Sequence, residues 1–253
     1  MSIYVRLLGP VELRVEGGVV NLGPAKRRAL LAALAMEANR PIRLTRLTSL
    51  LWTDPPPSSA VPNIRNHIMV LRRLLAGRID ARYRAYQLLL AAEELDVNEF
   101  LRRANDGRRA LRAGDPARAE SELAAALRLW RGPVGEDLTA GVELEARLHG
   151  LEEHRLQVVE DLVDARLELD HTGDLVPLLR EHLAAHALRE RAWAQLMLAL
   201  YRAGDPSGAL ATYRQAHDLL GARLGVAPGP ELADLHRAML RRAPWLDRTG
   251  AIR

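Results

Sequence analysis

The first 92 residues alternate short extended segments with amphipathic helical ones. Up to Leu22, three short β-branched segments separated by glycine turns predict a small antiparallel sheet. Apolar residues at helical spacing then predict helices over about 24–38, 44–52 and 60–75. Two further extended segments predict a hairpin over 79–90 with its turn at Arg84-Ala85. Sheet, three helices and a closing hairpin are the element order of a winged helix-turn-helix.

The predicted helix over 60–75 has one apolar face and one polar face. Ile64, Ile68, Leu71 and Leu75 recur at helical spacing and predict the buried side. The residues that fall off this side are Asn63, Arg65, Asn66, Met69, Arg72 and Arg73. A helix that carries arginine and asparagine on its outer side fits the major groove of DNA, where these side chains can reach base edges and phosphates.

Beyond Leu95 the pattern changes to leucine, alanine, arginine and glutamate at helical spacing, which predicts an all-α segment. Three turns recur in it, at 113–116, 172–174 and 203–206, each with Gly followed by Asp. In each turn we expect Gly to end one helix in a left-handed conformation and Asp to cap the next. The predicted fold is an α+β N-terminal winged helix-turn-helix at 1–92, followed by an all-α tetratricopeptide-like helical bundle at 93–253.

The charge of the chain changes sign at the same boundary. Residues 1–92 hold 14 Lys and Arg against 5 Asp and Glu, whereas residues 93–253 hold 22 against 27. The first segment therefore carries +9 and the second −5. A basic segment joined to an acidic one indicates that the first faces a polyanion and the second serves another purpose.

Composition excludes several other classes of protein. With no cysteine, the chain has no disulfide framework, thiolate zinc site or cysteine nucleophile. It shows no phosphate loop, dinucleotide glycine pattern or serine elbow, and His182 and His186 lack a third metal ligand of the right kind. No apolar run approaches a membrane span. We expect a cytoplasmic, nucleoid-associated protein that is not an enzyme, binds no cofactor, metal or membrane, and is regulated by its expression level.

Motifs along nearly the whole chain resemble the streptomycete antibiotic regulatory protein family, transcription activators that join an OmpR-type winged helix to a bacterial transcriptional activation domain. The matching segments are Leu7–Leu13, Lys26–Ala32, Leu50–Trp52, Leu71–Arg73, Leu129–Pro133, Leu188–Arg191, Gln195–Gly204 and Pro228–Leu232. The resemblance implies binding to direct repeats of double-stranded DNA as a dimer. It also implies recruitment of RNA polymerase holoenzyme to secondary-metabolite (antibiotic) genes.

The resemblance implies roles for residues in the third helix and the hairpin. Base reading falls on Arg65, and phosphate contacts fall on Asn63, His67 and Arg72, although His67 lies beside the apolar face and a structural imidazole is as good an interpretation. The other candidates for DNA binding are Asn66, Met69, Val70, Arg73, Arg82 and Arg84. Val70 stands where the family commonly has arginine or lysine, and Arg84-Ala85-Tyr86 replaces its Pro-Gly-Tyr.

Two other functions remain open at this stage. Val70 and the altered hairpin favour a tetratricopeptide-like protein-interaction scaffold whose winged helix no longer binds DNA specifically. A winged helix that binds RNA shares the basic charge but predicts insensitivity to duplex DNA sequence. The +9 charge of residues 1–92 favours the DNA-binding activator.

Overall fold

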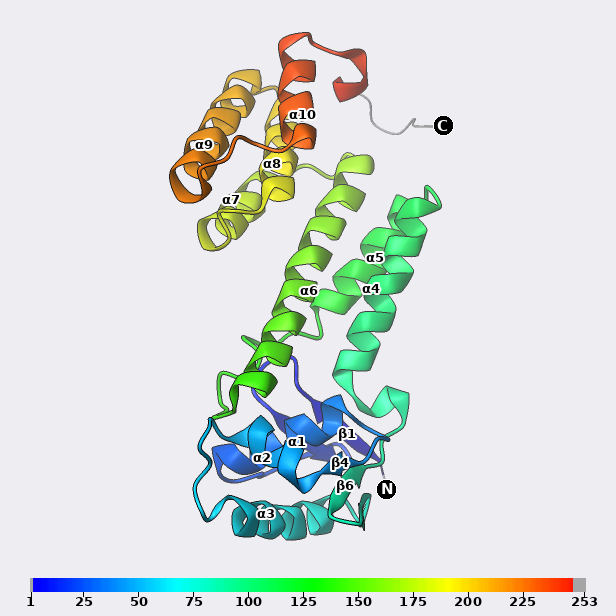
Figure 1. The fold of residues 1–253 in the computed structure, drawn as a ribbon. Helices are drawn as coiled ribbons and strands as arrows, with labels where there is room; N and C mark the ends of the chain where they lie inside the picture. Colours follow the sequence, from blue (N-terminus) through cyan, green and yellow to red (C-terminus); the bar gives the residue numbers. More distant parts are fainter. Residues whose placement is uncertain (1, 248–253) are drawn as a thin grey trace. The chain divides into compact units, whose positions relative to one another are not determined.

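The computed structural model describes residues 2–247, apart from the side chains of Arg82 and Asp247 (Figure 1). The strands are β1 Ile3–Arg6, β2 Glu12–Val15, β3 Gly18–Val20, β4 Ile42–Arg43, β5 Ile79–Arg82 and β6 Ala85–Leu88. The α-helices are α1 Ala25–Met36, α2 Leu44–Leu51, α3 Ala60–Leu74, α4 Asp96–Arg112, α5 Pro116–Leu127, α6 Val142–Glu168, α7 Leu175–Ala185, α8 Glu190–Arg202, α9 Pro206–Leu224 and α10 Pro230–Leu240. Short 3-10 turns, η1 and η2, occupy Ala92–Glu94 and Pro244–Asp247.

The contacts divide the chain into two compact units. Unit 1 holds the residues up to Asn105 together with Ala125–Leu156, and unit 2 holds Asp106–Ala124 and the residues from Gln157 onward. The boundary predicted between residues 92 and 93 stays a prediction. A division of the chain into compact units does not test where the domains of the family begin and end. No helix within residues 2–247 is both long and apolar enough to cross a membrane.

Unit 1 contains two small antiparallel sheets. β1, β2 and β3 pair in sequence order, as the β-branched segments predict, with Val5 opposite Leu13. The second sheet has the order β4-β6-β5, because Ile42 pairs with Tyr86. No local pattern marks Ile42 as part of a sheet, since its partner strand lies more than forty residues away in the sequence.

The helices α1, α2 and α3 agree with the sequence pattern to within two residues at each end. In α1, every residue from Ala29 to Ala35 is buried, so this stretch of the helix is covered around its whole circumference. In α3, Ile64, Ile68 and Leu71 are buried as predicted, and Leu75 is buried just after the helix. Burying these aliphatic side chains fixes the rotation of α3 about its axis.

Two of the three predicted helix turns have the expected chemistry. Gly114 and Gly204 have φ of +71° and +81°. The carboxylates of Asp115 and Asp205 accept hydrogen bonds from the backbone N–H groups three residues later, at 3.1 and 2.8 Å. These bonds satisfy donors that the first turn of a helix leaves unpaired.

The prediction for the turn at 172–174 was wrong in its details. The positive φ there belongs to Asp170, at 60°, and not to Gly173. Asp174 makes no side-chain cap at the start of α7. Because α6 ends at Glu168, the chain turns before it reaches the glycine, and His171 N–H donates to the Arg166 carbonyl to close that turn.

The first helical hairpin of unit 2 depends on a glycine inside α4. A Cβ built on Gly107 would lie 2.5 Å from Cγ of Leu123 on α5. Leu123 is fully buried, so it has little room to move away. The missing side chain therefore allows α4 and α5 to approach closely, at the cost that glycine carries inside a helix.

A buried ion network joins α6, α7 and α8 inside unit 2. The carboxylate of Glu160 is 3% exposed; it accepts hydrogen bonds from Arg189 and lies 3.5 Å from His182 Nε2. Burial by itself raises the pKa of Glu160, but the bonds from His182 and Arg189 outweigh it and lower that pKa to about 2. Gln195 adds a bond to the Glu160 carbonyl at 2.7 Å. Glu160 is therefore ionised at neutral pH and links three helices.

Candidate nucleic-acid interface

The outer face of α3 is polar and open to solvent. Asn63, Arg65 and Asn66 are exposed over the first turns, and Arg72 and Arg73 over the last. Met69, between them, is 50% exposed. The helix contains no acidic residue. From Asn63 to Arg73 the face runs for about 15 Å, given a rise of about 1.5 Å per residue.

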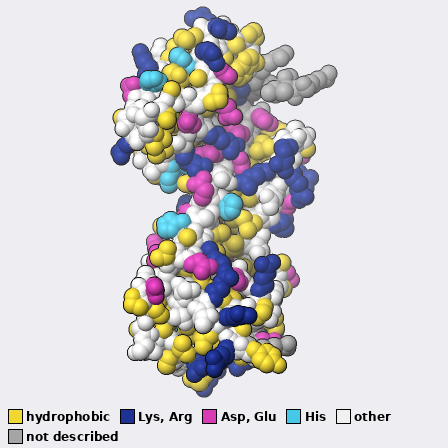
Figure 2. Space-filling view, viewed as in Figure 1, with side chains coloured by type: hydrophobic (Ala, Val, Ile, Leu, Met, Phe, Trp, Pro, Cys, Tyr) yellow, Lys and Arg dark blue, Asp and Glu magenta, His cyan; other side chains and the backbone are white. Residues whose placement is uncertain are grey.

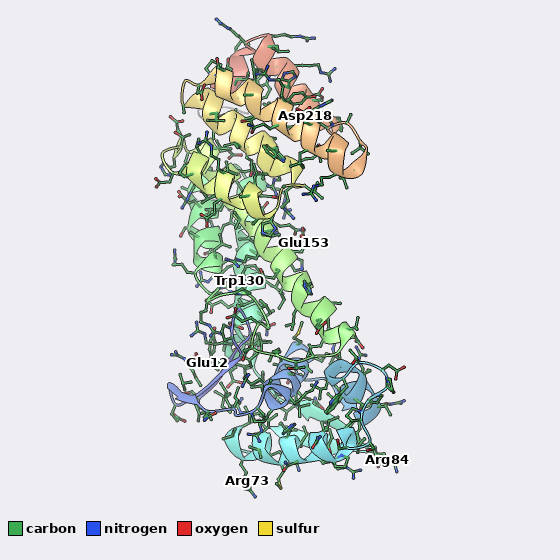
Figure 3. All side chains as sticks on the ribbon, turned by 90° about the vertical axis from the view of Figure 1, so that its left-hand side faces the viewer. Glu12, Arg73, Arg84, Trp130, Glu153 and Asp218 are labelled. Carbon is green, nitrogen blue, oxygen red and sulfur yellow. The ribbon has the colours of Figure 1, made fainter. Side chains whose placement is uncertain are left out.

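The arrangement offers both donors and an apolar contact to a negatively charged partner. No described carboxylate pairs with Arg65 or Arg73. Figure 2 shows lysine and arginine side chains gathered at the α3 end of unit 1, beside hydrophobic surface. Arg73 and Arg84 lie at the outer edge of the same unit and point away from its body (Figure 3). Unpaired guanidinium groups at this spacing can bind phosphates or the acceptor edge of guanine.

Two of the predicted contact residues lie deeper than the others. His67 and Val70 are half-buried. Nδ1 of His67 is fully buried, with no hydrogen-bond partner among the described residues. Burial, helped by the charge of Arg27, lowers the pKa of His67. The imidazole is therefore neutral at physiological pH, which favours the structural interpretation over the phosphate ligand.

Arg72 has a partner inside unit 1. Its Nε donates to the carbonyl of Ile79 at 2.8 Å. Ile79 begins β5, so this bond ties the C-terminal end of α3 to the hairpin. The remaining guanidinium nitrogens are left for a phosphate, but removal of Arg72 would also loosen the hairpin.

The hairpin turn lies one residue earlier than predicted. Arg82 pairs with Ala85, so the turn is formed by Tyr83 and Arg84, with φ of 45° and 61°. Two successive left-handed residues are the requirement of a type I′ turn, which usually selects asparagine and glycine. The predicted contact of Arg82 lies outside the described side chains. Arg84 is exposed, and its carbonyl accepts the N–H of Leu44 at 2.8 Å, which joins the hairpin to the start of α2.

The sequence did not single out Tyr83, although the structure places it fully exposed at the tip of the hairpin. An aromatic residue between two arginines at a strand end was the signal that pointed to it. The turn prediction missed this signal because it assigned Tyr83 to the strand.

Comparisons with known proteins agree on one family. A family model described as "Bacterial transcriptional activator domain" matches residues 95–240. Regulatory protein DnrI of Streptomyces peucetius is 32% identical over 260 residues, which cover 98% of this chain and 96% of DnrI. Transcriptional regulator RedD of Streptomyces coelicolor is 33% identical, over 99% of this chain and 74% of RedD. The chain belongs to the streptomycete antibiotic regulatory protein family.

A solved structure shares the fold of this family member. It is "Mycobacterium tuberculosis EmbR in complex with low affinity phosphopeptide", with a TM-score of 0.90 and 32% identity. The match covers 95% of this chain and 65% of the EmbR chain. The family activator described here therefore corresponds to about two thirds of the solved EmbR chain. The bound phosphopeptide is a finding about EmbR.

Two family motifs contact each other in this activator. The backbone N–H of Arg131, in the motif Leu129–Pro133, donates to the Leu8 carbonyl at 2.9 Å, and its guanidinium donates to the Pro10 carbonyl at 2.8 Å. Between them, Gly9 has a φ of +128°, and a Cβ there would lie 3.1 Å from Cβ of Arg131. Glycine is needed at this position by both its φ and the close approach.

The single lysine of the activator joins two segments of unit 1 that lie far apart in the sequence. Lys26 Nζ donates to the carbonyls of Leu51 and Thr139, the latter at 3.1 Å, and lies 4.9 Å from the centre of the Trp52 ring. Burial lowers the pKa of Lys26, while Glu145 acts against that shift. The body that carries α3 thus includes residues of the matched activator domain.

Proposed function

We propose that this family member is a sequence-specific DNA-binding transcriptional activator. In this proposal the sheets and α1–α3 form a winged helix-turn-helix, α3 enters the major groove, and the β5–β6 hairpin is the wing. The helices from α4 onward form a tetratricopeptide-like bundle that contacts RNA polymerase. The observation that carries the proposal is the outer face of α3, which is exposed, free of acidic residues and free of carboxylate partners at Arg65 and Arg73.

The proposed roles follow from reach and polarity. Arg65 lies near the start of α3 and donates to guanine O6 and N7, as a guanidinium does in the major groove. Asn63 and Arg73, at the two ends of the helix, hold phosphates. Met69 and Val70 offer apolar contact to a thymine methyl group. Asn66 has the amide geometry that recognises adenine.

Arg72 and the hairpin take supporting roles in this proposal. The bond from Arg72 to the Ile79 carbonyl sets the angle between α3 and the hairpin, so Arg72 positions the wing as well as offering charge to a phosphate. Arg82 and Arg84 reach the sugar-phosphate backbone or the adjacent minor groove.

The family suggests the regulatory setting. Relatives named as regulatory proteins cover almost the whole of this chain, in Streptomyces among other bacteria. We infer that the protein binds direct repeats as a dimer upstream of promoters and activates secondary-metabolite genes. We also infer that it acts in the cytoplasm on the nucleoid.

One experiment separates base reading from charge. The affinity of wild type, Arg65→Ala and Arg73→Ala is measured across a salt titration, on a duplex selected from the source genome and on random duplex DNA. Arg65→Ala should lose about 1–3 kcal/mol on the selected duplex and much less on random DNA. Arg73→Ala should weaken both alike and lower the salt slope by about one unit. Arg73 serves as the phosphate probe because it lacks the structural bond that Arg72 makes.

Two results would contradict the proposal. Equal losses for both variants on both duplexes would make Arg65 a backbone contact only, and no binding to any duplex would favour the interaction scaffold.

The direct-repeat arrangement has its own test. Insertion of about 5 bp between half-sites spaced by one helical turn should abolish cooperative binding, because the second site then faces the opposite side of the duplex.

A further inference from the structure

A trough opens among α7, α8 and α9 inside unit 2. Its volume is about 590 Å³, within the range of about 300–1,000 Å³ that small-molecule sites occupy. Leu183 from α7 and Trp193, Leu196 and Leu200 from α8 form an apolar base, and all four are buried. The DNA contacts proposed on α3 and the β5–β6 hairpin do not involve the residues that line this trough. These helices are adjacent in Figure 1, with α8 packed against both α7 and α9.

The trough is hollow because its walls carry small side chains. Ala184 and Ala187 line it on the α7 side, and Gly208 and Ala211 line it on the α9 side. Gly208 cannot carry a side chain without moving the helix cap, because a Cβ there would lie 2.1 Å from the Asp205 carboxylate that accepts its N–H. The cap of α9 and the open wall thus depend on the same glycine.

The polar groups of the lining are unequal in what they can offer a ligand. Trp193 Nε1 already donates to the Ala187 carbonyl at 2.8 Å, and Thr212 Oγ1 donates to the Gly208 carbonyl at 2.9 Å. Arg180 on α7 and Gln215 on α9 are exposed and have no hydrogen-bond or ion-pair partner among the described residues. The uncommitted groups are therefore one guanidinium and one amide on opposite walls.

The charge of the lining selects the ligand. Among the described residues, the lining contains Arg180 as its only charged side chain and no carboxylate. A guanidinium binds a carboxylate with two parallel hydrogen bonds, which are stronger than bonds between neutral groups. We propose that the trough is a binding site for a small amphipathic carboxylic acid, with its carboxylate between Arg180 and Gln215 and its apolar body over Trp193 and Leu196.

The test uses the full chain without DNA, so that it is independent of the DNA-binding proposal. Binding of 2-naphthoate is compared with that of 2-naphthamide, its neutral isostere, by isothermal titration calorimetry. We expect the carboxylate to bind at least about tenfold more tightly. Arg180→Gln should remove that preference by weakening naphthoate alone. Ala211→Leu should weaken both ligands, because the added side chain fills the trough.

Matched controls keep the result interpretable. Arg214→Gln changes an exposed arginine of α9 outside the lining and should leave both affinities unchanged. Gln215→Ala tests the opposite wall by a second exposed substitution and should weaken naphthoate severalfold. The proposal is overturned if neither compound binds or if both bind equally. It is also overturned if Arg180→Gln and Ala211→Leu bind as the wild type does.

Discussion

Asp96 is the residue whose removal tests most directly whether residues 1–92 are a complete folding unit. Its carboxylate is 1% exposed, at the start of α4, and lies four residues beyond the predicted domain boundary. It accepts the backbone N–H of Leu7 at 2.8 Å and that of Leu8 at 3.1 Å. Both residues are fully buried, so these N–H groups have no access to water. We predict that Asp96→Ala strongly destabilises the protein.

The magnitude follows from the groups left behind. An unpaired buried donor costs about 1–3 kcal/mol, and the substitution leaves two. Loss of a negative charge at the helix N-terminus adds about 0.3–1 kcal/mol. Burial raises the pKa of Asp96, with the N–H groups of Leu7 and Leu8 acting against it, so part of the gain is offset by desolvation. We therefore expect a loss of about 3–5 kcal/mol.

Urea unfolding of the full chain, followed by circular dichroism, measures this loss. Asp96→Asn keeps one carbonyl acceptor and should lose about half as much. Glu93→Ala, an exposed substitution three residues earlier, should change the free energy of unfolding by less than about 0.5 kcal/mol. A loss below about 1 kcal/mol for Asp96→Ala would refute the reasoning, because the two N–H groups would then have found other partners.

The same contact bears on any experiment that uses the N-terminal segment alone. Residues 1–92 are the predicted DNA-binding domain, so a fragment of this length is the obvious candidate for DNA-binding tests. A fragment that ends at residue 92 lacks Asp96 and also Arg131, which bonds to the Leu8 and Pro10 carbonyls. We expect that fragment to be much less stable than unit 1 in the intact chain. DNA-binding tests are therefore best made on the full chain.

Three further predictions concern other parts of the molecule. Gly107→Ala should destabilise the protein by about 1–3 kcal/mol, because the added methyl group would overpack against α5. Gly150→Ala, with open space around it in α6, should stabilise the protein by about 0.5–1 kcal/mol. Equal effects of the two substitutions in thermal melts would contradict the close approach of α4 to α5. Because the pKa of Glu160 is lowered to about 2, its ionised carboxylate contributes about 3 kcal/mol to the free energy of unfolding above about pH 4.5, and this contribution is lost as pH falls towards 2. Glu160→Gln should therefore make the free energy of unfolding less dependent on pH over that range. Replacing Tyr83 by Asn and Arg84 by Gly should stabilise the hairpin turn by about 1–2 kcal/mol in unfolding experiments and weaken DNA binding, while unchanged stability would argue against the left-handed conformation.

Local patterns in the sequence determined most of the secondary structure and the orientation of α3. Ile64, Ile68 and Leu71 are spaced so that a helix must place them on one side, and any core that covers them exposes Arg65 and Arg73. The two turns with Gly, Asp and Pro were equally predictable, because left-handed conformation and capping involve only neighbouring residues. The sequence alone therefore predicted which residues form the outer face of α3.

The tertiary structure decided everything that depends on residues far apart in the chain. Only the fold shows that Arg72 is bonded to Ile79, that His67 is held neutral by burial, and that Asp96 pairs the N–H groups of the β1–β2 connection. The trough over Trp193 likewise needs small residues from separate helices to meet. Hydrophobic periodicity predicts which side of a helix or strand is buried, but it does not identify the element that packs against that side. The packing partner determines the hydrogen bonds and the charge state of each buried polar group.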